Sequence, residues 1–529
     1  MSSHEYIFTV DLGTSGPKVA LISTRGDVLG GEFEPVDLLL LPGGGAEQDP
    51  HAWWAAICRA SQRLLAQKRV PLDAIIGIAC TAQWSGTVPV DKAGEPLMNA
   101  IIWMDTRGAT HVQKLIEGWI QVDGIGLGSA LAWLPKTGGM PSRSGKDSIA
   151  HMLWLKHERP EIYEKTATFL EPNNYLNMRM TGEVYATYDS IALTWVTDNR
   201  NIDDVRYDPA LLKRTTLDPA KLPPLKRAVD VVGNLLPGPA AELGLPAGLP
   251  VVGGAPDTHS AAIGSGAVRD FECHLYLGTS SWLIGHVPFK KTDILHNMAS
   301  LPSSIPGRYI LLNEQECAGV CLTFLRDKVF FPEDLLTVGN RPEKLYALFD
   351  RLAESSPPGA NKLMFAPWLY GERTPIEDHT VRGGFFNLSL TSTRADMVRA
   401  VLEGVAFNAR WLRVYVEKFM GRRLEAIHVI GGGATSPTWC QIMADVLGRP
   451  IRQMKEPLWS NSRGVGLLGA VGLKRVTFEE LANQAQVERV FEPNRANQAL
   501  YDELFEVFTQ LYERQKPLYA RLNAAHGKV

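Results

Sequence analysis

The chain has 529 residues, of which 45% are hydrophobic and 21% charged, and its formal net charge is −3. This length exceeds what one hydrophobic core usually supports, so we expect at least two globular domains. The absence of a dense lysine and arginine block argues against a nucleic-acid or anionic-membrane surface, which makes small-molecule chemistry the default. No apolar run is long enough to cross a bilayer, and no secretory signal pattern is present, so the cytoplasm is the expected location.

Alternating strands and helices are predicted in the first half of the chain. Apolar, β-forming runs between turn residues predict four strands, at residues 5–13, 18–23, 26–36 and 74–83. Amphipathic patterns predict helices at 49–68 and 109–120, and Asp49 followed by Pro50 gives the first helix a capped start. Residues 121–148 are rich in Gly and Ser, and we expect a long loop or insertion there.

The strand and turn order of residues 5–23 recurs at residues 273–287. Both segments contain the sequence LGTS, at 12–15 and 277–280, directly after a run of apolar β-formers. Two further helices and one buried strand are predicted after the second copy, at residues 393–420, 436–448 and 426–434. We interpret the recurrence as an internal duplication that gives two domains of related topology. Chance recurrence of four common residues is the alternative.

The first LGTS turn has the composition of a phosphate-binding loop. Gly13 permits close approach of a ligand, and Thr14 and Ser15 supply hydroxyls and successive N–H groups that can form an anion nest. Asp11 can hold Mg²⁺ directly or through water, and Lys18 can add a positive charge. The alternative is a tight hairpin in which Asp11 only caps the turn.

Other nucleotide signatures are weaker or missing. The sequence contains no GxxxxGK[ST] loop, which disfavours a P-loop kinase. Residues 464–469, GVGLLG, match GxGxxG without the expected preceding strand, so close helix packing is the better interpretation. Three glycines at 431–433 lie between a predicted strand and a helix that begins around Ser436, a geometry that can admit a base or phosphates against bare backbone.

Asp257 is the strongest candidate for a catalytic carboxylate. A buried strand at Leu249–Val252 leads into it through small residues, and a helix of small residues follows. Such an Asp can accept a proton from a substrate hydroxyl that attacks the γ-phosphate of ATP. The alternative role is that of a helix N-cap, and the two roles can coexist because they use different oxygens.

The chain resembles the FGGY carbohydrate kinases of the actin-like ATPase superfamily. The segments that carry this resemblance cover nearly the whole chain in the expected order and are VDLGTSGPK, AEQDPHAWW, AQWSGTVPVDKAGEPLMNAIIWMDTR, GGAPDTHSAAIGSG, LYLGTSSW, PWLYGERTPIEDHTVRGGFFNLSLTSTRADMVRAVLEGVAF and IGGGATSPTW. Within the family, EQDP with its two tryptophans and GERTP through RGGFFNL look most like xylulokinases.

The resemblance implies an α/β fold of two RNase-H-like domains, residues 1–254 and 255–529, with ATP and Mg²⁺ in a cleft between them. It implies Asp11 as the carboxylate associated with Mg²⁺ and Asp257 as the catalytic base. The residues that it places at the nucleotide are Thr14, Ser15, Lys18, Thr279, Gly319, Gly432, Gly433 and Ala434. Those that it places at the sugar are Gln83, Trp84, Ser85, Asp257 and Thr258.

The departures from the family pattern lie at the sugar. Typical xylulokinases have Gln-Met-His-Gly where this chain has residues 83–86, and Asp-Asn where it has residues 257–258. Losing a His and an Asn removes groups that pair with sugar hydroxyls, which changes substrate discrimination. The expected reaction is ATP-dependent phosphorylation of a ketopentose such as D-xylulose. Ribulose, glycerol and gluconate are alternative substrates, a non-catalytic ATP-dependent switch is the alternative function, and a homodimer is one candidate assembly.

Overall fold

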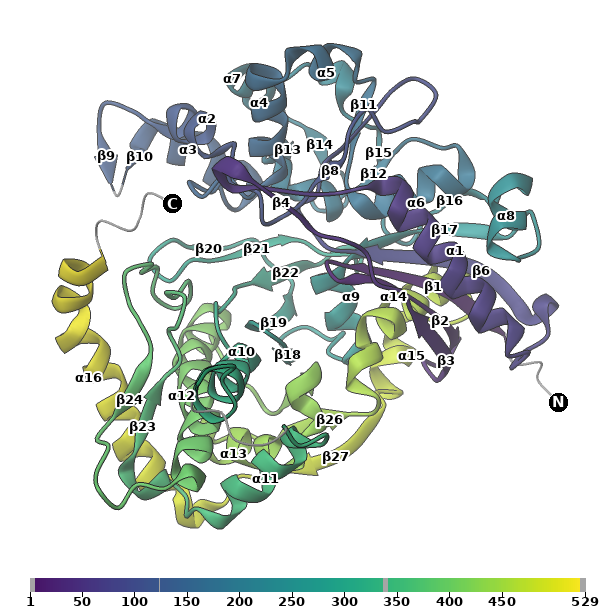
Figure 1. The fold of residues 1–529 in the computed structure, drawn as a ribbon. Helices are drawn as coiled ribbons and strands as arrows, with labels where there is room; N and C mark the ends of the chain where they lie inside the picture. The colour runs from purple at the N-terminus through teal and green to yellow at the C-terminus, as the bar shows by residue number, and fades with distance from the viewer. Residues whose placement is uncertain (1–4, 123, 336–340, 524–529) are drawn as a thin grey trace.

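The computed structural model describes residues 5–122, 124–335 and 341–523 as two α/β halves, each built around one large sheet (Figure 1). The strands of the first sheet are, in spatial order, β16 (Val231–Asn234), β17 (Pro250–Pro256), β6 (Ile75–Ala82), β1 (Tyr6–Gly13), β2 (Gly16–Ser23) and β3 (Val28–Phe33). The strands of the second are β20 (Thr292–Asp293), β21 (Met298–Pro302), β22 (Tyr309–Leu312), β19 (Ser281–Val287), β18 (Cys273–Leu277), β25 (Ile427–Ile430), β26 (Ile451–Met454) and β27 (Val487–Phe491).

Six neighbouring strands of each sheet share one pattern of directions. In the first half, β1 pairs antiparallel with β2, β2 pairs antiparallel with β3, and β6 lies parallel to β1. In the second half, β18, β19, β22 and β25 repeat this arrangement. The next strands outward, β17 and β26, are parallel, and β16 and β27 are antiparallel. The prediction that the two LGTS segments mark domains of related topology is therefore confirmed.

The best-predicted helices begin and end where their sequences indicate. Helix α1 (Pro50–Ala66) is capped by Asp49, whose carboxylate accepts a hydrogen bond from His51 N at 2.8 Å. Helix α12 (Arg394–Met420) begins with a capping box and ends at a left-handed glycine. Helix α13 (Pro437–Leu447) is capped by Ser436, close to the predicted start. These helices form because their capping residues satisfy N–H groups that have no partner within the helix.

The other helices are α2 (Ala109–Ile116), α3 (Leu127–Thr137), α4 (Ser148–Glu158), α5 (Pro160–Lys165), α6 (Pro172–Thr181), α7 (Pro209–Thr215), α8 (Pro237–Leu243), α9 (Asp257–Gly264), α10 (Gly319–Phe324), α11 (Leu345–Ser355), α14 (Ser460–Gly472), α15 (Phe478–Asn483) and α16 (Gln498–Asn523). The short strands outside the two large sheets are β4 (Leu39–Leu41), β5 (Gly45–Gln48), β7 (Val88–Val90), β8 (Ala100–Ile101), β9 (Gln121–Val122), β10 (Ile125–Gly126), β11 (Thr168–Leu170), β12 (Ala186–Thr187), β13 (Thr197–Asp198), β14 (Arg206–Tyr207), β15 (Leu225–Lys226), β23 (Met364–Ala366) and β24 (Gly384–Phe386). In the described parts of the chain, no helix is both long and apolar enough to span a membrane.

The expectation of a long loop or insertion at 121–148 is wrong for residues 121–122 and 125–137 and agrees with the structure at 138–147, which form no helix or strand. This segment contains the β9–β10 hairpin and helix α3, although residue 123 lies outside the described residues. Buried Trp133 fixes α3, because its indole N–H donates to the carbonyl of Trp195 at 2.8 Å. Helix α2 also ends at Ile116, four residues before the predicted end.

Helix α14 lies late in the sequence yet packs on the first sheet, beside α9 (Figure 1). A Cβ atom at Gly464 would lie 1.8 Å from the carbonyl oxygen of Ser260, and one at Gly264 would lie 1.8 Å from that of Ser460. The GVGLLG segment is therefore a helix-packing surface, as predicted, and it ties the second part of the chain to the first sheet.

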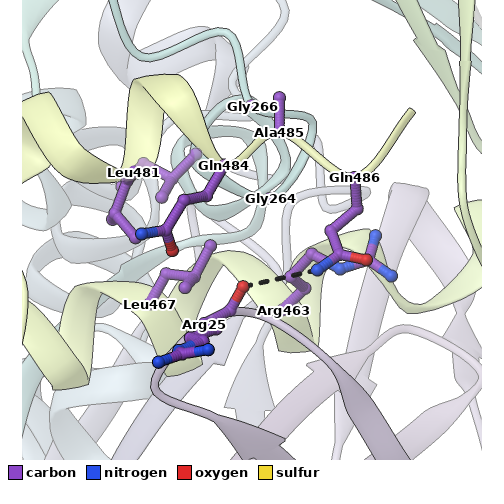
Figure 2. Close-up of a pocket in the computed structure, with 10 residues that line it drawn as sticks. Arg25, Gly264, Gly266, Arg463, Leu467, Leu481, Gln484, Ala485 and Gln486 are labelled. Carbon is purple, nitrogen blue, oxygen red and sulfur yellow. Dashed lines mark hydrogen bonds between the residues drawn. The ribbon is translucent and has the colours of Figure 1, made fainter.

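A small pocket lies beside this helix pair (Figure 2). Its lining residues are Arg25, Ile263, Gly264, Gly266, Arg463, Leu467, Leu481, Gln484, Ala485 and Gln486. Gln486 Nε2 donates to the carbonyl of Arg25 at 3.5 Å. Buried Arg463 donates through Nε to the carbonyl of Gly26 at 2.9 Å. None of the predicted site residues lines this pocket, so the candidate active site lies elsewhere.

Candidate active site

The turn between β1 and β2 is tied to the end of β6 by side chains. Thr14 Oγ1 donates to Gln83 Oε1 at 3.0 Å and accepts from Trp103 Nε1 at 3.0 Å. Gln48 Nε2 donates to the Thr14 carbonyl at 2.8 Å, and Gln83 Nε2 donates to Gln48 Oε1 at 2.7 Å. The hydroxyl proton of Thr14 is therefore engaged within the protein. Thr14, which is predicted to bind phosphate, and Gln83, which is predicted to bind the sugar, therefore share one hydrogen-bond network.

Asp11 lies at the end of β1 and is buried. Lys18 Nζ lies 3.4 Å from Asp11 Oδ2 and is partly exposed, while Ser15 at the tip of the turn is exposed. No group of three or more His, Cys, Asp or Glu residues that could hold a metal occurs in the described parts of the chain. Asp11 still fits Mg²⁺, because this ion is commonly held by one or two carboxylates together with substrate phosphates and water.

The second LGTS turn packs against the start of α10. The carbonyl of Thr279 accepts from Ala318 N at 2.9 Å, and the carbonyl of Gly278 accepts from Gly319 N at 2.8 Å. A Cβ atom at Gly319 would lie 2.5 Å from the Gly278 oxygen, so only glycine fits there. The structure thus brings together Thr279 and Gly319, which the sequence places 40 residues apart.

The three-glycine segment lies against the end of β18. A Cβ atom would approach the Leu277 carbonyl oxygen to 2.7 Å from Gly431, and the Leu277 Cβ to 2.8 Å from Gly433. At Gly432 it would meet no atom within 4 Å, and this residue is exposed. Packing therefore accounts for two of the glycines, and Gly432 is the one that presents open backbone. Ala434, which follows, is buried and accepts from Gln453 Nε2 at 2.7 Å.

Asp257 is the first residue of α9 and is partly exposed. Its Oδ1 accepts from Thr258 N at 2.8 Å, although the N-cap position itself belongs to Pro256. Desolvation by the surrounding protein raises the pKa of Asp257 to about 7, and the negative charges of Asp11 and, less strongly, Glu314 act in the same direction. This carboxyl group can therefore gain and lose a proton near neutral pH.

Tyr276 connects the second sheet to these carboxylates. It belongs to β18, three residues before Thr279, and its ring stacks on Trp282 with centroids 4.0 Å apart. Burial raises the pKa of Tyr276 to about 12, and the charges of Asp257 and Asp11 contribute to this rise. The end of β18 thus lies within electrostatic reach of both candidate acidic residues.

The donor groups of three predicted sugar residues, Trp84, Ser85 and Thr258, are engaged within the protein. Trp84 Nε1 donates to the Ser190 carbonyl at 2.9 Å, and Ser85 Oγ donates to the Lys146 carbonyl at 2.7 Å. Because His259 Nε2 lies 3.1 Å from the Pro302 carbonyl, that nitrogen carries the proton, and His259 Nδ1 accepts from Thr258 Oγ1 at 3.2 Å. These side chains can offer a sugar apolar faces and lone pairs, while its oxygens need donors from elsewhere.

Sequence reasoning missed a buried acid behind this turn. Glu171 Oε2 accepts from Gly86 N at 3.0 Å, and its other oxygen accepts from the hydroxyl of Ser148. Ser85 has a φ of +60°, a conformation that non-glycine residues seldom adopt. Burial raises the pKa of Glu171 to about 8. We conclude that Glu171 holds the turn in place.

A group of charged residues between the two halves also carried no assigned role in the sequence. Arg373 donates to Glu316 Oε1 through Nε at 2.9 Å and through Nη2 at 2.7 Å, and it pairs with Glu314. Lys146, from the first half, lies within the electrostatic influence of all three. The local sequence signal for this group is the spacing of Glu314 and Glu316, because residues two apart point to the same side of an extended segment.

Comparisons with known proteins agree with this architecture. The family model described as "FGGY family of carbohydrate kinases, N-terminal domain" matches residues 6–264, and the corresponding C-terminal domain matches residues 273–473. A xylulose kinase of Staphylococcus epidermidis is 30% identical over 98% of both chains. Two solved structures from Lactobacillus acidophilus, a gluconate kinase and a ligand-bound xylulose kinase, each superpose with a TM-score of 0.84 at 25% identity, covering 98% of this chain and 100% of theirs.

Proposed function

The chain belongs to the FGGY family of carbohydrate kinases, and within that ATP-dependent activity we propose that its acceptor is a ketopentose such as D-xylulose. Its similarity to a xylulose kinase over 98% of both chains supports this choice. The division into domains at residues 1–254 and 255–529 and a homodimeric assembly remain predictions.

We propose Asp257 as the general base. In the transfer step, the acceptor hydroxyl oxygen forms a bond to the γ-phosphorus, the bond from that phosphorus to the bridging oxygen of ADP breaks, and Asp257 takes the hydroxyl proton. The observation that carries the proposal is the position of Asp257 near Asp11, with a pKa of about 7. A carboxylate with this pKa is basic enough to accept the proton and is still largely ionised above neutral pH.

The nucleotide is proposed to lie between the two hairpin turns. On the first turn, Lys18 and the main-chain N–H groups of Thr14 and Ser15 would bind phosphate oxygens. On the second, Thr279 would contact phosphates, and Gly319, Gly432, Gly433 and Ala434 would lie at the adenine nucleotide. Asp11 would hold Mg²⁺, which when bound neutralises phosphate charge during transfer.

The acceptor is proposed to bind at residues 83–85 and 257–258, where the chain departs from the pattern of typical xylulokinases. Gluconate is a second candidate, because the gluconate kinase structure superposes as well as the xylulose kinase structure does. Both alternatives use the same proposed base and nucleotide site, so only the acceptor contacts distinguish them.

The test is ADP production by the purified protein with ATP and Mg²⁺ against D-xylulose, D-ribulose, glycerol and D-gluconate. We expect one ketopentose to stimulate the wild type most strongly. Asp257→Asn should lower turnover by about a hundredfold or more while leaving ATP affinity nearly unchanged. Undiminished turnover in this variant would remove Asp257 from its proposed role, and stronger stimulation by gluconate would replace the ketopentose as substrate.

A further inference from the structure

In the described parts of the chain, the ammonium group of Lys146 forms no ion pair and no hydrogen bond. The side chain is partly buried, and Nζ lies over the Trp103 ring, 5.8 Å from its centroid. An ammonium has three donors and no acceptor, so a ligand oxygen is the partner that suits it.

The position of Lys146 places this ammonium beside the proposed acceptor site. The main-chain carbonyl of Lys146 accepts a hydrogen bond from Ser85 Oγ at 2.7 Å. Trp103, whose ring lies near the ammonium group, donates through Nε1 to Thr14 Oγ1. Glu314 acts electrostatically on both Lys146 and Asp257. Lys146 therefore lies next to the predicted sugar residue Ser85 and near the first hairpin turn. Glu314 lies within electrostatic reach of both Lys146 and the proposed base, Asp257.

Acidic groups surround Lys146 and Arg373 before any ligand binds. Arg373 donates to Glu316, forms an ion pair with Glu314 and lies beside buried Glu372. Lys146 lies within the electrostatic influence of Glu314 and Glu316. A further anion here would add an uncompensated negative charge near Asp257 and the ATP phosphates, and repulsion between like charges is strong away from bulk water.

We propose that Lys146 forms a subsite for a neutral polyhydroxylated acceptor, which Lys146 Nζ binds by donating to a carbonyl or hydroxyl oxygen. This inference rests on the proposed function and deepens it, because the subsite selects neutral sugars over sugar acids. It also supplies the donor that the engaged side chains of Trp84, Ser85 and Thr258 do not.

The experiment measures sugar binding separately from turnover. Tryptophan fluorescence of the full chain is titrated with D-xylulose, D-ribulose and D-gluconate without ATP, and acceptor KM, ATP KM and kcat are measured in parallel. Lys146→Met keeps the unbranched stem, one atom shorter, and removes the charge, and Lys146→Gln keeps a donor without the charge. Lys114→Met is the matched control, because Lys114 is exposed on α2 and lies outside the proposed site.

We expect Lys146→Met to weaken ketose binding and raise acceptor KM by about tenfold or more, with ATP KM changed less than about twofold. Lys146→Gln should fall between the wild type and Lys146→Met, and Lys114→Met should match the wild type. Thermal unfolding of Lys146→Met should stay near the wild-type temperature, because the substitution removes no direct ion pair or hydrogen bond of the folded protein. A purely structural role would instead lower this temperature and leave the acceptor KM unchanged.

The outcomes separate this inference from the proposed function. Ketose binding that depends on Lys146 without any ADP production would support the subsite and overturn the kinase reaction with that ketose. ADP production with the same acceptor KM in Lys146→Met and the wild type would overturn the subsite and keep the reaction. Tighter binding of D-gluconate than of either ketose, or no binding of any ketose to the wild type, would overturn the selection of neutral sugars.

Discussion

Thr14 Oγ1 donates a hydrogen bond to Gln83 Oε1 at 3.0 Å, which joins the first hairpin turn to the end of the neighbouring parallel strand β6. The two residues lie 69 positions apart in the sequence, and each is proposed to serve a different substrate. A change at either residue is therefore transmitted to the other through this bond and through Gln48, which bonds to both, rather than through a rearrangement of the sheet.

The first prediction is that Thr14→Val and Gln83→Ala are not additive. Each substitution alone breaks the bond between the two side chains, so the double variant loses it only once. We expect a coupling free energy of about 0.5–1.5 kcal/mol in acceptor kcat/KM, the usual contribution of one hydrogen bond. Steady-state kinetics of the four proteins measures this energy. A coupling near zero would mean that the two turns act independently.

The second prediction concerns the pH dependence of catalysis. Asp257 must be ionised to accept a proton, and its pKa is raised to about 7 by desolvation and by Asp11. Acceptor kcat/KM should therefore fall as the pH decreases below about 7, by about tenfold per pH unit at the acidic end. The profile is measured from pH 5.5 to 8.5. Asp11→Asn should shift its midpoint to lower pH, since it removes a repulsive charge, and a flat profile would contradict the proposed base.

The third prediction concerns Glu171 and the free energy of unfolding. Its folded-state pKa of about 8 lies above the ordinary value of 4.5, so the folded state retains a proton that the unfolded state releases. The resulting stabilisation is complete below about pH 4.5 and is lost as the pH rises through about 8. Within this window, the loss is at most about 1.4 kcal/mol per pH unit.

Glu171→Gln should remove this pH dependence and keep the hydrogen bonds to Gly86 N and the Ser148 hydroxyl. Denaturant unfolding of both proteins at pH 6, 7 and 8 measures the difference. The variant should gain stability relative to the wild type as the pH rises. Parallel curves for the two proteins would show that Glu171 is already ionised in the folded state.

The sequence predicts those parts of the fold that depend on local patterns. Apolar runs and turn residues identify the hairpins at both LGTS segments, and the cap at Asp49 identifies the start of α1. Helix α3 escaped prediction because Gly128 and Pro135 favour a loop locally. Its helical state depends on tertiary burial, including the bond from Trp133 to a residue 62 positions away.

The same distinction applies to the candidate site: some of its residues can be predicted from the local sequence, and others cannot. Asp11, Thr14 and Asp257 lie where strands end beside small residues, a pattern visible in the sequence. Lys146 and Glu171 contact the residue 83–86 turn from 61 and 85 positions away, and nothing in their local sequence indicates those contacts. Donor and acceptor pairing in the fold, rather than residue type, gives these two residues their proposed roles.

The last prediction tests the contact between α9 and α14. Gly464→Ala would place a methyl group 1.8 Å from the main-chain oxygen of Ser260, which cannot move without displacing α9. We expect a loss of about 1–3 kcal/mol or more in unfolding free energy, together with reduced kcat because Asp257 is the first residue of α9.

Gly128→Ala is the matched control, since Gly128 is an exposed glycine of helix α3 whose Cβ would meet no atom within 4 Å. There the substitution should be neutral or should add up to about 1 kcal/mol, the gain in helix propensity from glycine to alanine. Thermal and urea unfolding of the two variants make the comparison. Equal changes in unfolding free energy for the two variants would mean that the α9–α14 contact tolerates a side chain. In that case α9 can shift without loss of the fold.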